Sequence, residues 1–173
     1  MSGGLRIADA ARVETLLDTL AGRIRAELEP CDLTLVGLLR RGAPLARRIG
    51  RRLGESVPVG VLRLERYADD LTVVHETPRL DEESLDVDVA GRTVVIVDDV
   101  LYSGRTLLRA AVHLNERGAR RVLAAVLCSR GGQDLPVAAV LVGMHLELGP
   151  ELIVDVRIPP YEDELGVDLN PKP

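Results

Sequence analysis

The fold of this chain is decided by Val94-Val95-Ile96-Val97-Asp98-Asp99-Val100-Leu101-Tyr102-Ser103-Gly104-Arg105-Thr106, near the middle of the sequence. Its apolar first part indicates a parallel strand buried on both faces, expected from Thr93 to Val97. Apolar residues then recur at helical spacing from Leu107 to Leu114, and Gly118 is a natural helix end. The order strand, loop, helix is typical of α/β folds, whose ligands bind beyond the carboxyl ends of the strands. The two adjacent aspartates fall at that position.

The loop from Leu101 to Thr106 has the composition of an anion-binding turn. Its backbone N–H groups and the helix N-terminus that follows favour a phosphate. Gly104 permits close backbone approach, and the hydroxyls of Ser103 and Thr106 add donors. Adjacent carboxylates would repel a bare phosphate, but they suit a ligand with vicinal hydroxyls or a metal-masked diphosphate beside its phosphate. A phosphorylated ribose fits this description; a plain strand end and turn is the alternative.

The segment from Val97 to Thr106 resembles the phosphoribosyl diphosphate (PRPP) motif of type I phosphoribosyltransferases, and its residues most resemble those of the PyrR family. PyrR-type proteins combine uracil phosphoribosyltransferase activity with regulation of pyrimidine operons by RNA binding. The resemblance implies that Asp98 and Asp99 bind the ribose 2′- and 3′-hydroxyls and are catalytic. The other substrate-binding residues that it implies here are Val100, Leu101, Tyr102, Ser103, Gly104, Arg105 and Thr106, of which the last five would hold the 5′-phosphate.

A second segment, Gly37 to Gly42, resembles the pyrophosphate loop of the same family. Arg41 would be catalytic and grip the leaving pyrophosphate with two donors, and Arg40 and Gly42 would complete the loop. The family often has a cis peptide bond before this arginine, here Arg40–Arg41. PyrR sequences usually read Thr-Arg-Gly, so Arg40 is a departure. An ordinary strand–helix loop with exposed arginines is the alternative.

A third segment, Arg66 to Thr72, resembles the start of the family's flexible loop. The resemblance implies a lid at about residues 67–87, with Tyr67, Asp69 and Asp70 as substrate contacts. Ala68 stands where the family commonly has arginine, a departure that bears on lid closure and phosphate neutralisation. A surface loop of the same length is the alternative.

A fourth segment, Ser129 to Val137, resembles the PyrR hood, which covers the pyrimidine ring. Arg130 and Val137 are the expected substrate contacts, and the N- and C-terminal segments would complete the hood. Gly132 and Gln133 replace the family's histidine and arginine, which removes two side-chain donors from base recognition. A phosphoribosyltransferase of different base preference is therefore an alternative.

The remaining chain agrees with an α/β fold: a central, mainly parallel sheet flanked by helices, like that of type I phosphoribosyltransferases. Its 173 residues suit one phosphoribosyltransferase domain over residues 1–173. We expect helices at 9–28 and 44–53, strands at 33–36, 57–64, 122–127 and 138–142, and an edge strand at 152–156.

Composition limits the possible functions. No segment has about 18 unbroken apolar residues, so no membrane span is expected, and no signal peptide is visible. Cys31 and Cys128 are expected to be buried thiols rather than a disulfide, which favours a cytoplasmic protein. Neither cysteine has neighbours at zinc-ligand spacing. The only lysine, Lys172, lies in the tail, which argues against Schiff-base chemistry.

Binding to an mRNA leader is the least determined prediction. The net charge of −5 opposes non-specific attraction to nucleic acid. Two arginine groups could still form local patches, and ordinary charged surfaces paired with Glu27, Glu29 or Glu55 are the alternative. The acidic tail 162–164 is expected to be solvated. The patches consist of Arg47, Arg48, Arg51 and Arg52 on the second helix and Arg117, Arg120 and Arg121 around Gly118.

Together these observations predict that uracil and PRPP give UMP and pyrophosphate. Mg²⁺ that arrives with PRPP, with Asp98 and Asp99 as candidate ligands, would screen the diphosphate. No covalent nucleophile is needed. The resemblance also implies a homodimer or higher homo-oligomer. A non-catalytic, nucleotide-sensing, RNA-binding attenuator is the remaining alternative.

Overall fold

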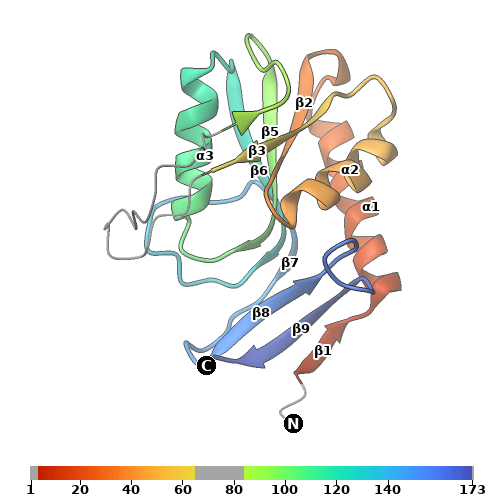
Figure 1. Ribbon diagram of the computed structural model, residues 1–173, viewed down its shortest axis with the longest axis vertical. Helices are drawn as coiled ribbons and strands as arrows, with labels where there is room; N and C mark the ends of the chain where they lie inside the picture. Colours follow the sequence, from red (N-terminus) through yellow and green to blue (C-terminus); the bar gives the residue numbers. More distant parts are fainter. Residues whose placement is uncertain (1–3, 65–83, 173) are drawn as a thin grey trace, which may run out of the picture.

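The computed structural model describes residues 4–64 and 84–172, which form two β-sheets and three α-helices (Figure 1). The helices are α1 (Ala10–Glu27), α2 (Gly42–Leu53) and α3 (Arg105–Glu116). The strands are β1 (Leu5–Ala8), β2 (Leu33–Leu38), β3 (Val59–Arg63), β4 (Ser84–Leu85), β5 (Thr93–Leu101), β6 (Arg121–Ser129), β7 (Leu141–His145), β8 (Leu152–Arg157) and β9 (Gly166–Pro171).

The larger sheet has the strand order β4-β3-β2-β5-β6-β7, in which only β4 runs antiparallel to its neighbour. Its central strand is β5, where Val95 pairs with Leu35 of β2 and with Leu123 of β6. The predicted α/β fold with a central, mainly parallel sheet is therefore confirmed.

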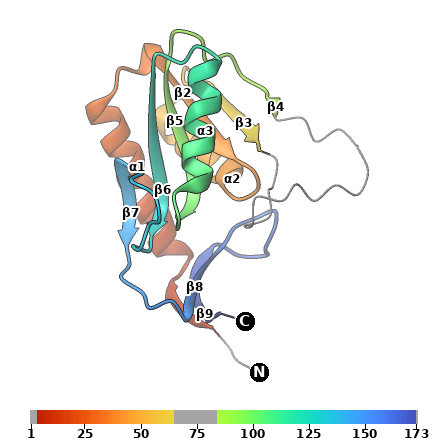
Figure 2. The same cartoon turned by 90° about the vertical axis from the view of Figure 1, so that its left-hand side faces the viewer.

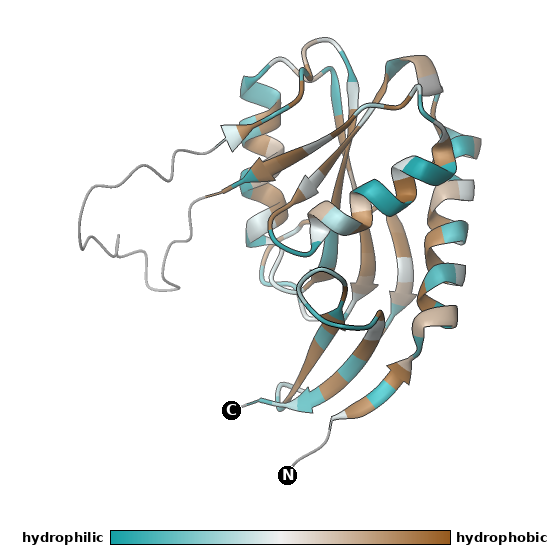
Figure 3. Cartoon of the chain, turned by 45° about the vertical axis from the view of Figure 1, so that its right-hand side comes forward, coloured by the Kyte–Doolittle hydropathy of each residue, from teal (hydrophilic) through white to brown (hydrophobic). Residues whose placement is uncertain are grey.

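Both faces of β5 are covered, which explains its continuous apolar run. Because side chains alternate along a strand, Val95 and Val97 join the core beneath α1 and α2, whereas Val94 and Ile96 join the core beneath α3. Figure 3 shows the apolar strands between the amphipathic helices. Each such side chain stabilises the fold by about 1.5–3 kcal/mol through burial.

Helix α1 begins and ends where the sequence predicts. The side chain of Asp9 accepts a hydrogen bond of 2.8 Å from the N–H of Arg12, a standard N-cap. At the other end, the N–H of Leu28 closes the last turn on the carbonyl of Ile24.

A second sheet, of order β1-β9-β8, is antiparallel and unites the N-terminal and C-terminal segments. It lies beyond the end of the larger sheet toward which β5 and β6 run (Figures 1 and 2). The edge strand predicted at 152–156 is present as β8, which lies at the edge of this second sheet and pairs with β9. The alternation of side chains along a strand indicates which face is buried but does not identify the strand that lies beside it.

Several element boundaries differ from those predicted. β5 continues through Asp98 and Asp99 to Leu101, because β6 supplies paired residues along that length. The strand expected at 138–142 lies at Leu141–His145, since its register with β6 begins at Leu141. The second helix begins at Gly42 rather than at Pro44, and β3 is three residues shorter than expected.

The two cysteines have different surroundings. Cys128 is fully buried, and burial together with the charge of Asp99 raises the pKa of its thiol to about 12. Cys31 is exposed, which corrects the expectation that both thiols are buried. It follows helix α1 in a short 3-10 turn rather than lying within the strand. None of the helices described is long and apolar enough to cross a membrane.

Candidate active site

The carboxylate pair lies in the last part of β5, at the carboxyl edge of the parallel sheet. The N–H of Asp99 donates to Oδ1 of Asp98 at 3.0 Å, and the N–H of Val100 donates to Oδ1 of Asp99 at 2.8 Å. Both side chains are partly buried. Because β6 pairs with Asp98 and Val100, the backbone of the carboxylate pair is held in a strand rather than in a loop.

Desolvation raises the pKa of both carboxyl groups. For Asp98 the rise is large, and the adjacent charge of Asp99 adds to the effect of burial. For Asp99, burial also raises the pKa, while the hydrogen bond from Val100 and the charge of Arg41 oppose it. A pair of carboxylates that is costly to ionise favours a ligand that brings positive charge or donor hydroxyls.

The turn after β5 is shorter than the sequence predicts, because Leu101 still belongs to the strand and Arg105 and Thr106 open helix α3. Gly104 has φ = 84°, in the left-handed region that glycine adopts without strain. The N–H of Arg105 donates to Oγ of Ser103 at 3.4 Å. Tyr102 to Thr106 therefore place the N-terminus of α3 next to the carboxylates, as a phosphate site requires.

The predicted pyrophosphate loop joins β2 to α2 and lies against β5. A Cβ atom on Gly42 would overlap the carbonyl oxygen of Val97, so this position requires glycine. A Cβ atom on Gly37 would lie 2.5 Å from Cα of Ala43. The cis peptide bond is Leu39–Arg40 and not Arg40–Arg41. The sequence has no feature that distinguishes these neighbouring non-proline bonds.

The two arginines of this loop contact the turn between β8 and β9. Nη2 of Arg41 donates to Oε1 of Glu162 at 2.5 Å and lies 3.7 Å from Oδ1 of Asp155. The guanidinium of Arg40 lies 4.8 Å from the centre of the Tyr161 ring. The hydrogen bond to Glu162 raises the pKa of Arg41. These contacts correct the expectation of a solvated acidic tail for Glu162, whereas Asp163 and Glu164 are exposed as expected.

Sequence reasoning missed these three C-terminal residues. Glu162 lies 121 residues from Arg41, and no local pattern relates the two. Glu164, in the same acidic run, also has cationic neighbours: it lies 2.6 Å from Arg6 and 3.9 Å from Arg157. The proportion of arginine could have suggested ion pairs, but not their partners.

Arg130 links the phosphate turn to the segment after β7. Its side chain is buried, its guanidinium lies 4.5 Å from the centre of the Tyr102 ring, and its Nη2 donates to the carbonyl of Gly149 at 3.0 Å. Val137 lies against Gly104, since a Cβ atom on that glycine would be 3.1 Å from Cβ of Val137. Both expected hood contacts thus adjoin the turn from Tyr102 to Thr106.

Tyr67, Asp69 and Asp70 lie outside the described residues, as does most of the expected lid. The described end of that segment is not an irregular loop. It contains β4, which pairs with β3, and Oδ1 of Asp86 accepts a hydrogen bond of 2.6 Å from the N–H of Val61.

Two of the four arginines in the expected basic patch on α2 form ion pairs with α1. Arg48 lies 2.7 Å from Glu14, and Arg52 pairs with both Glu14 and Asp18 of α1. In the second group, Arg120 lies 2.9 Å from Asp32. The alternative of paired helix surfaces therefore holds for these three arginines, with partners other than those considered. Arg47, Arg51, Arg117 and Arg121 are exposed.

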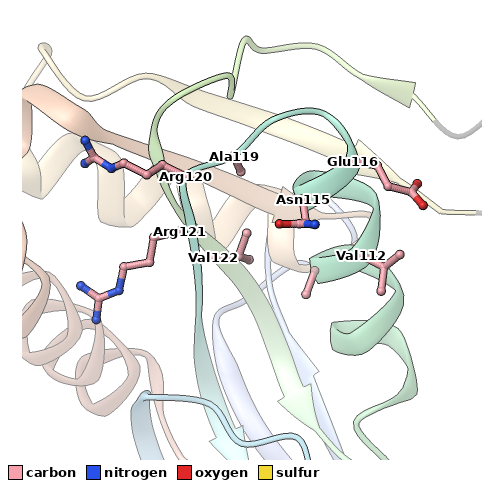
Figure 4. Close-up of a pocket in the computed structure, with 8 residues that line it drawn as sticks. Val112, Asn115, Glu116, Ala119, Arg120, Arg121 and Val122 are labelled. Atoms are coloured by element: carbon pink, nitrogen blue, oxygen red, sulfur yellow. The ribbon is translucent and has the colours of Figure 1, made fainter.

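A shallow pocket of about 420 Å³ lies between α3 and the start of β6 (Figure 4). It is at the amino end of β6, away from the carboxylate pair. In Figure 4, Arg120 and Arg121 point away from Val112 and Asn115 on the helix. The pocket therefore has no relation to the candidate site. Its lining consists of Ala111, Val112, Asn115, Glu116, Ala119, Arg120, Arg121 and Val122.

Comparison with known proteins agrees with this geometry. The phosphoribosyl transferase domain family matches residues 4–155, so the chain is a member of the phosphoribosyltransferases. A hypoxanthine phosphoribosyltransferase structure from Staphylococcus aureus has a TM-score of 0.77 at 16% identity and covers 97% of this chain and 91% of its own. A hypoxanthine-guanine phosphoribosyltransferase from Bacillus anthracis has a TM-score of 0.74 at 15% identity and covers 97% of both chains. At these identities the two structures show a shared fold.

Sequence relatives show to which family of phosphoribosyltransferases the chain belongs. A protein named "Bifunctional protein PyrR" from Thermus thermophilus is 41% identical over 142 residues, which is 79% of this chain and 78% of the relative. Proteins of the same name from Roseiflexus sp. and Clostridium perfringens are 42% and 37% identical; the matches cover 79% and 80% of this chain and 76% and 80% of the relatives. The chain belongs to the PyrR family.

Proposed function

We propose that this protein transfers the phosphoribosyl group from PRPP to uracil, giving UMP and pyrophosphate. The observation that carries the proposal is the packing of Gly42 against Val97, which brings the Arg41 loop to the strand that holds Asp98 and Asp99. With the turn at Gly104, one sheet edge then has a place for a diphosphate, a diol and a 5′-phosphate. Membership of the PyrR family supports uracil as the base.

In this proposal Asp98 and Asp99 hold the ribose hydroxyls, and their negative charge favours positive charge at the anomeric carbon. Arg41 and the backbone N–H groups of its loop stabilise the departing pyrophosphate, an electrostatic contribution of the kind that usually dominates enzyme catalysis. Uracil attacks from the opposite face, so no covalent nucleophile takes part. Tyr67, Asp69 and Asp70 would complete the site from the lid.

Phosphoribosyltransferases generally use Mg²⁺ together with PRPP, and the donor set here fits that ion. Oxygen ligands from one or two carboxylates, shared with substrate phosphates, are what Mg²⁺ prefers. Among the residues described, no group of three metal-binding side chains exists, so the ligand must supply most of the coordination. We propose that Asp98 and Asp99 hold Mg²⁺ jointly with PRPP, and that the ion neutralises diphosphate charge.

The test is turnover with radiolabelled PRPP and a panel of uracil, hypoxanthine, xanthine, guanine and adenine. We expect UMP and little product from the purines. Because Gly132 and Gln133 replace two family donors, the panel also tests the alternative of a changed base preference. Product from a purine but none from uracil would contradict the proposal.

We also propose regulation of pyrimidine genes through an mRNA leader, since the curated relatives are named bifunctional. The exposed Arg47 and Arg51 on α2 support it, because the ion pairs between α2 and α1 use Arg48 and Arg52. A homodimer or higher homo-oligomer and a cytoplasmic location belong to the same proposal. Filter binding to a leader RNA across salt concentrations, with and without UMP, tests it. We expect R47Q/R51Q to weaken binding and to lower the salt dependence, and an unchanged affinity would count against it.

A further inference from the structure

The turn between β8 and β9 lies over the start of α2 and its preceding loop (Figure 2). It is closed by hydrogen bonds from the N–H groups of Tyr161 and Glu162 to the carbonyl of Ile158, at 3.0 and 3.2 Å. The turn therefore has a defined shape and presents Glu162 to the pyrophosphate loop.

Both oxygens of Glu162 are engaged. Oε1 accepts from Nη2 of Arg41 at 2.5 Å, and Oε2 accepts from the N–H of Ile158 at 2.8 Å. Burial acts to raise the pKa of Glu162, but the hydrogen bonds from Arg41 and Ile158 outweigh it and the pKa is lowered. Glu162 is therefore an anion at neutral pH.

Glu162 contacts Nη2 of Arg41, the nitrogen on which bidentate binding of a diphosphate depends. A guanidinium can bind two oxygens at once through either of two edges, and both edges include Nη2. Here that nitrogen is approached by Glu162 and, at 3.7 Å, by Asp155. Nη2 has one N–H group on each edge, so a diphosphate held in a bidentate manner must either share this nitrogen with Glu162 or displace Glu162 from it. It must also enter beside two carboxylates of its own sign.

We propose that Glu162 is a positioning residue that pairs with Arg41 and competes with the diphosphate for it. This inference rests on the proposed function, because it takes the Arg41 loop as the pyrophosphate site. Before PRPP binds, Glu162 keeps Arg41 oriented; it weakens the binding of PRPP and pyrophosphate, and it promotes pyrophosphate release.

The first experiment is calorimetric titration of the wild-type protein and of E162Q with magnesium pyrophosphate and with PRPP. We expect E162Q to bind each ligand about 3- to 30-fold more tightly, the range that loss of one charged competitor implies. E164Q is the matched control, because Glu164 lies in the same turn but contacts Arg6 and Arg157. Its affinity should equal that of the wild type.

Steady-state kinetics separate competition from a structural role. We expect E162Q to lower the KM for PRPP, and to lower kcat where pyrophosphate release limits turnover. E162D, which keeps the charge, should restore the wild-type values in part. Should E162Q prove unstable in thermal melts, D155N tests the same competition, with a smaller gain in affinity expected from its longer distance.

The outcomes are distinguishable. If the wild type binds PRPP and E162Q binds it equally or more weakly, the inference fails and the proposed function stands. If neither protein binds PRPP or pyrophosphate, the proposed function fails, and the inference fails with it. Tighter binding by both E162Q and E164Q would indicate a general charge effect and would also overturn the role of Glu162.

Discussion

Two groups of carboxylates in this protein have opposite surroundings. Asp98 and Asp99 lie side by side on β5, where burial raises the pKa of each. Glu162 and Glu164 lie on a turn where hydrogen bonds from arginines lower the pKa of each. Glu162 and Glu164 each accept a hydrogen bond from an arginine, whereas Asp99 is influenced by the charge of Arg41.

This difference separates the roles of the two groups. Desolvation makes the pair on β5 costly to ionise, and a functional site can explain why the protein keeps two such carboxyl groups together. Arg41 stands between the groups: it pairs with Glu162, and its charge also lowers the pKa of Asp99. We therefore expect the β5 pair to govern activity and the turn to govern affinity and stability.

The largest effect should come from D99N. Loss of this charge removes stabilisation at the anomeric carbon, and we expect kcat/KM to fall by about 100-fold or more. The melting temperature should stay the same or rise, because a desolvated carboxyl group is replaced by a neutral amide. A clear loss of stability with little loss of turnover would show that the pair is structural.

The next effect should come from R41Q. Loss of the guanidinium removes the proposed grip on the diphosphate, and we expect affinity for PRPP to fall by about 10- to 100-fold, as for a charged hydrogen bond. Because the charge of Arg41 also holds down the pKa of Asp99, that pKa should rise further. Calorimetry measures the first change, and carboxyl titration by NMR measures the second. The double variant R41Q/E162Q should lose no more affinity than R41Q alone.

The two groups should have opposite effects on stability as pH changes. The raised pKa values of Asp98 and Asp99 mean that the folded state binds protons more tightly than the unfolded state, so stability falls as pH rises from about 4 through the folded pKa. The lowered pKa of Glu162 has the opposite sign: it stabilises above about pH 4 and is lost as pH falls below that value. Chemical denaturation of the wild type, D98N and E162Q from pH 3 to 8 measures both slopes. D98N should be less sensitive to rising pH, and E162Q less sensitive to falling pH.

The smallest effect should come from Y161L. The contact between Arg40 and the Tyr161 ring is worth about 0.5–1 kcal/mol at a partly exposed site. We expect the melting temperature to fall by about 1–4 °C, with PRPP affinity unchanged or slightly higher because the turn is held less firmly. A large fall in PRPP affinity would show that the turn supports the site rather than competes within it.

The sequence predicted most of the larger sheet and the positions of the aspartate pair, the phosphate turn and the Arg41 loop. These signals are local: burial on both faces gives β5 a continuous apolar run, and helical spacing identifies α1 and α3. The end of β5 was predicted less well, because Asp98 and Asp99 disfavour strands. There, pairing of Asp98 with Val126 and of Val100 with Cys128 outweighs their propensity.

Local patterns in the sequence are thus sufficient to predict an α/β core with a PyrR-type set of ligand-binding segments, since each of these is encoded within a few adjacent residues. The folded chain was needed to show that β1, β8 and β9 form a separate sheet, that Arg130 lies on Tyr102, and that Glu162 holds Arg41. These contacts join different elements of the fold, and the pairing of β1 with β9 and of Arg41 with Glu162 spans more than a hundred residues of the chain. No local pattern records which of many arginines and carboxylates will meet, because the fold of the whole chain sets their distances.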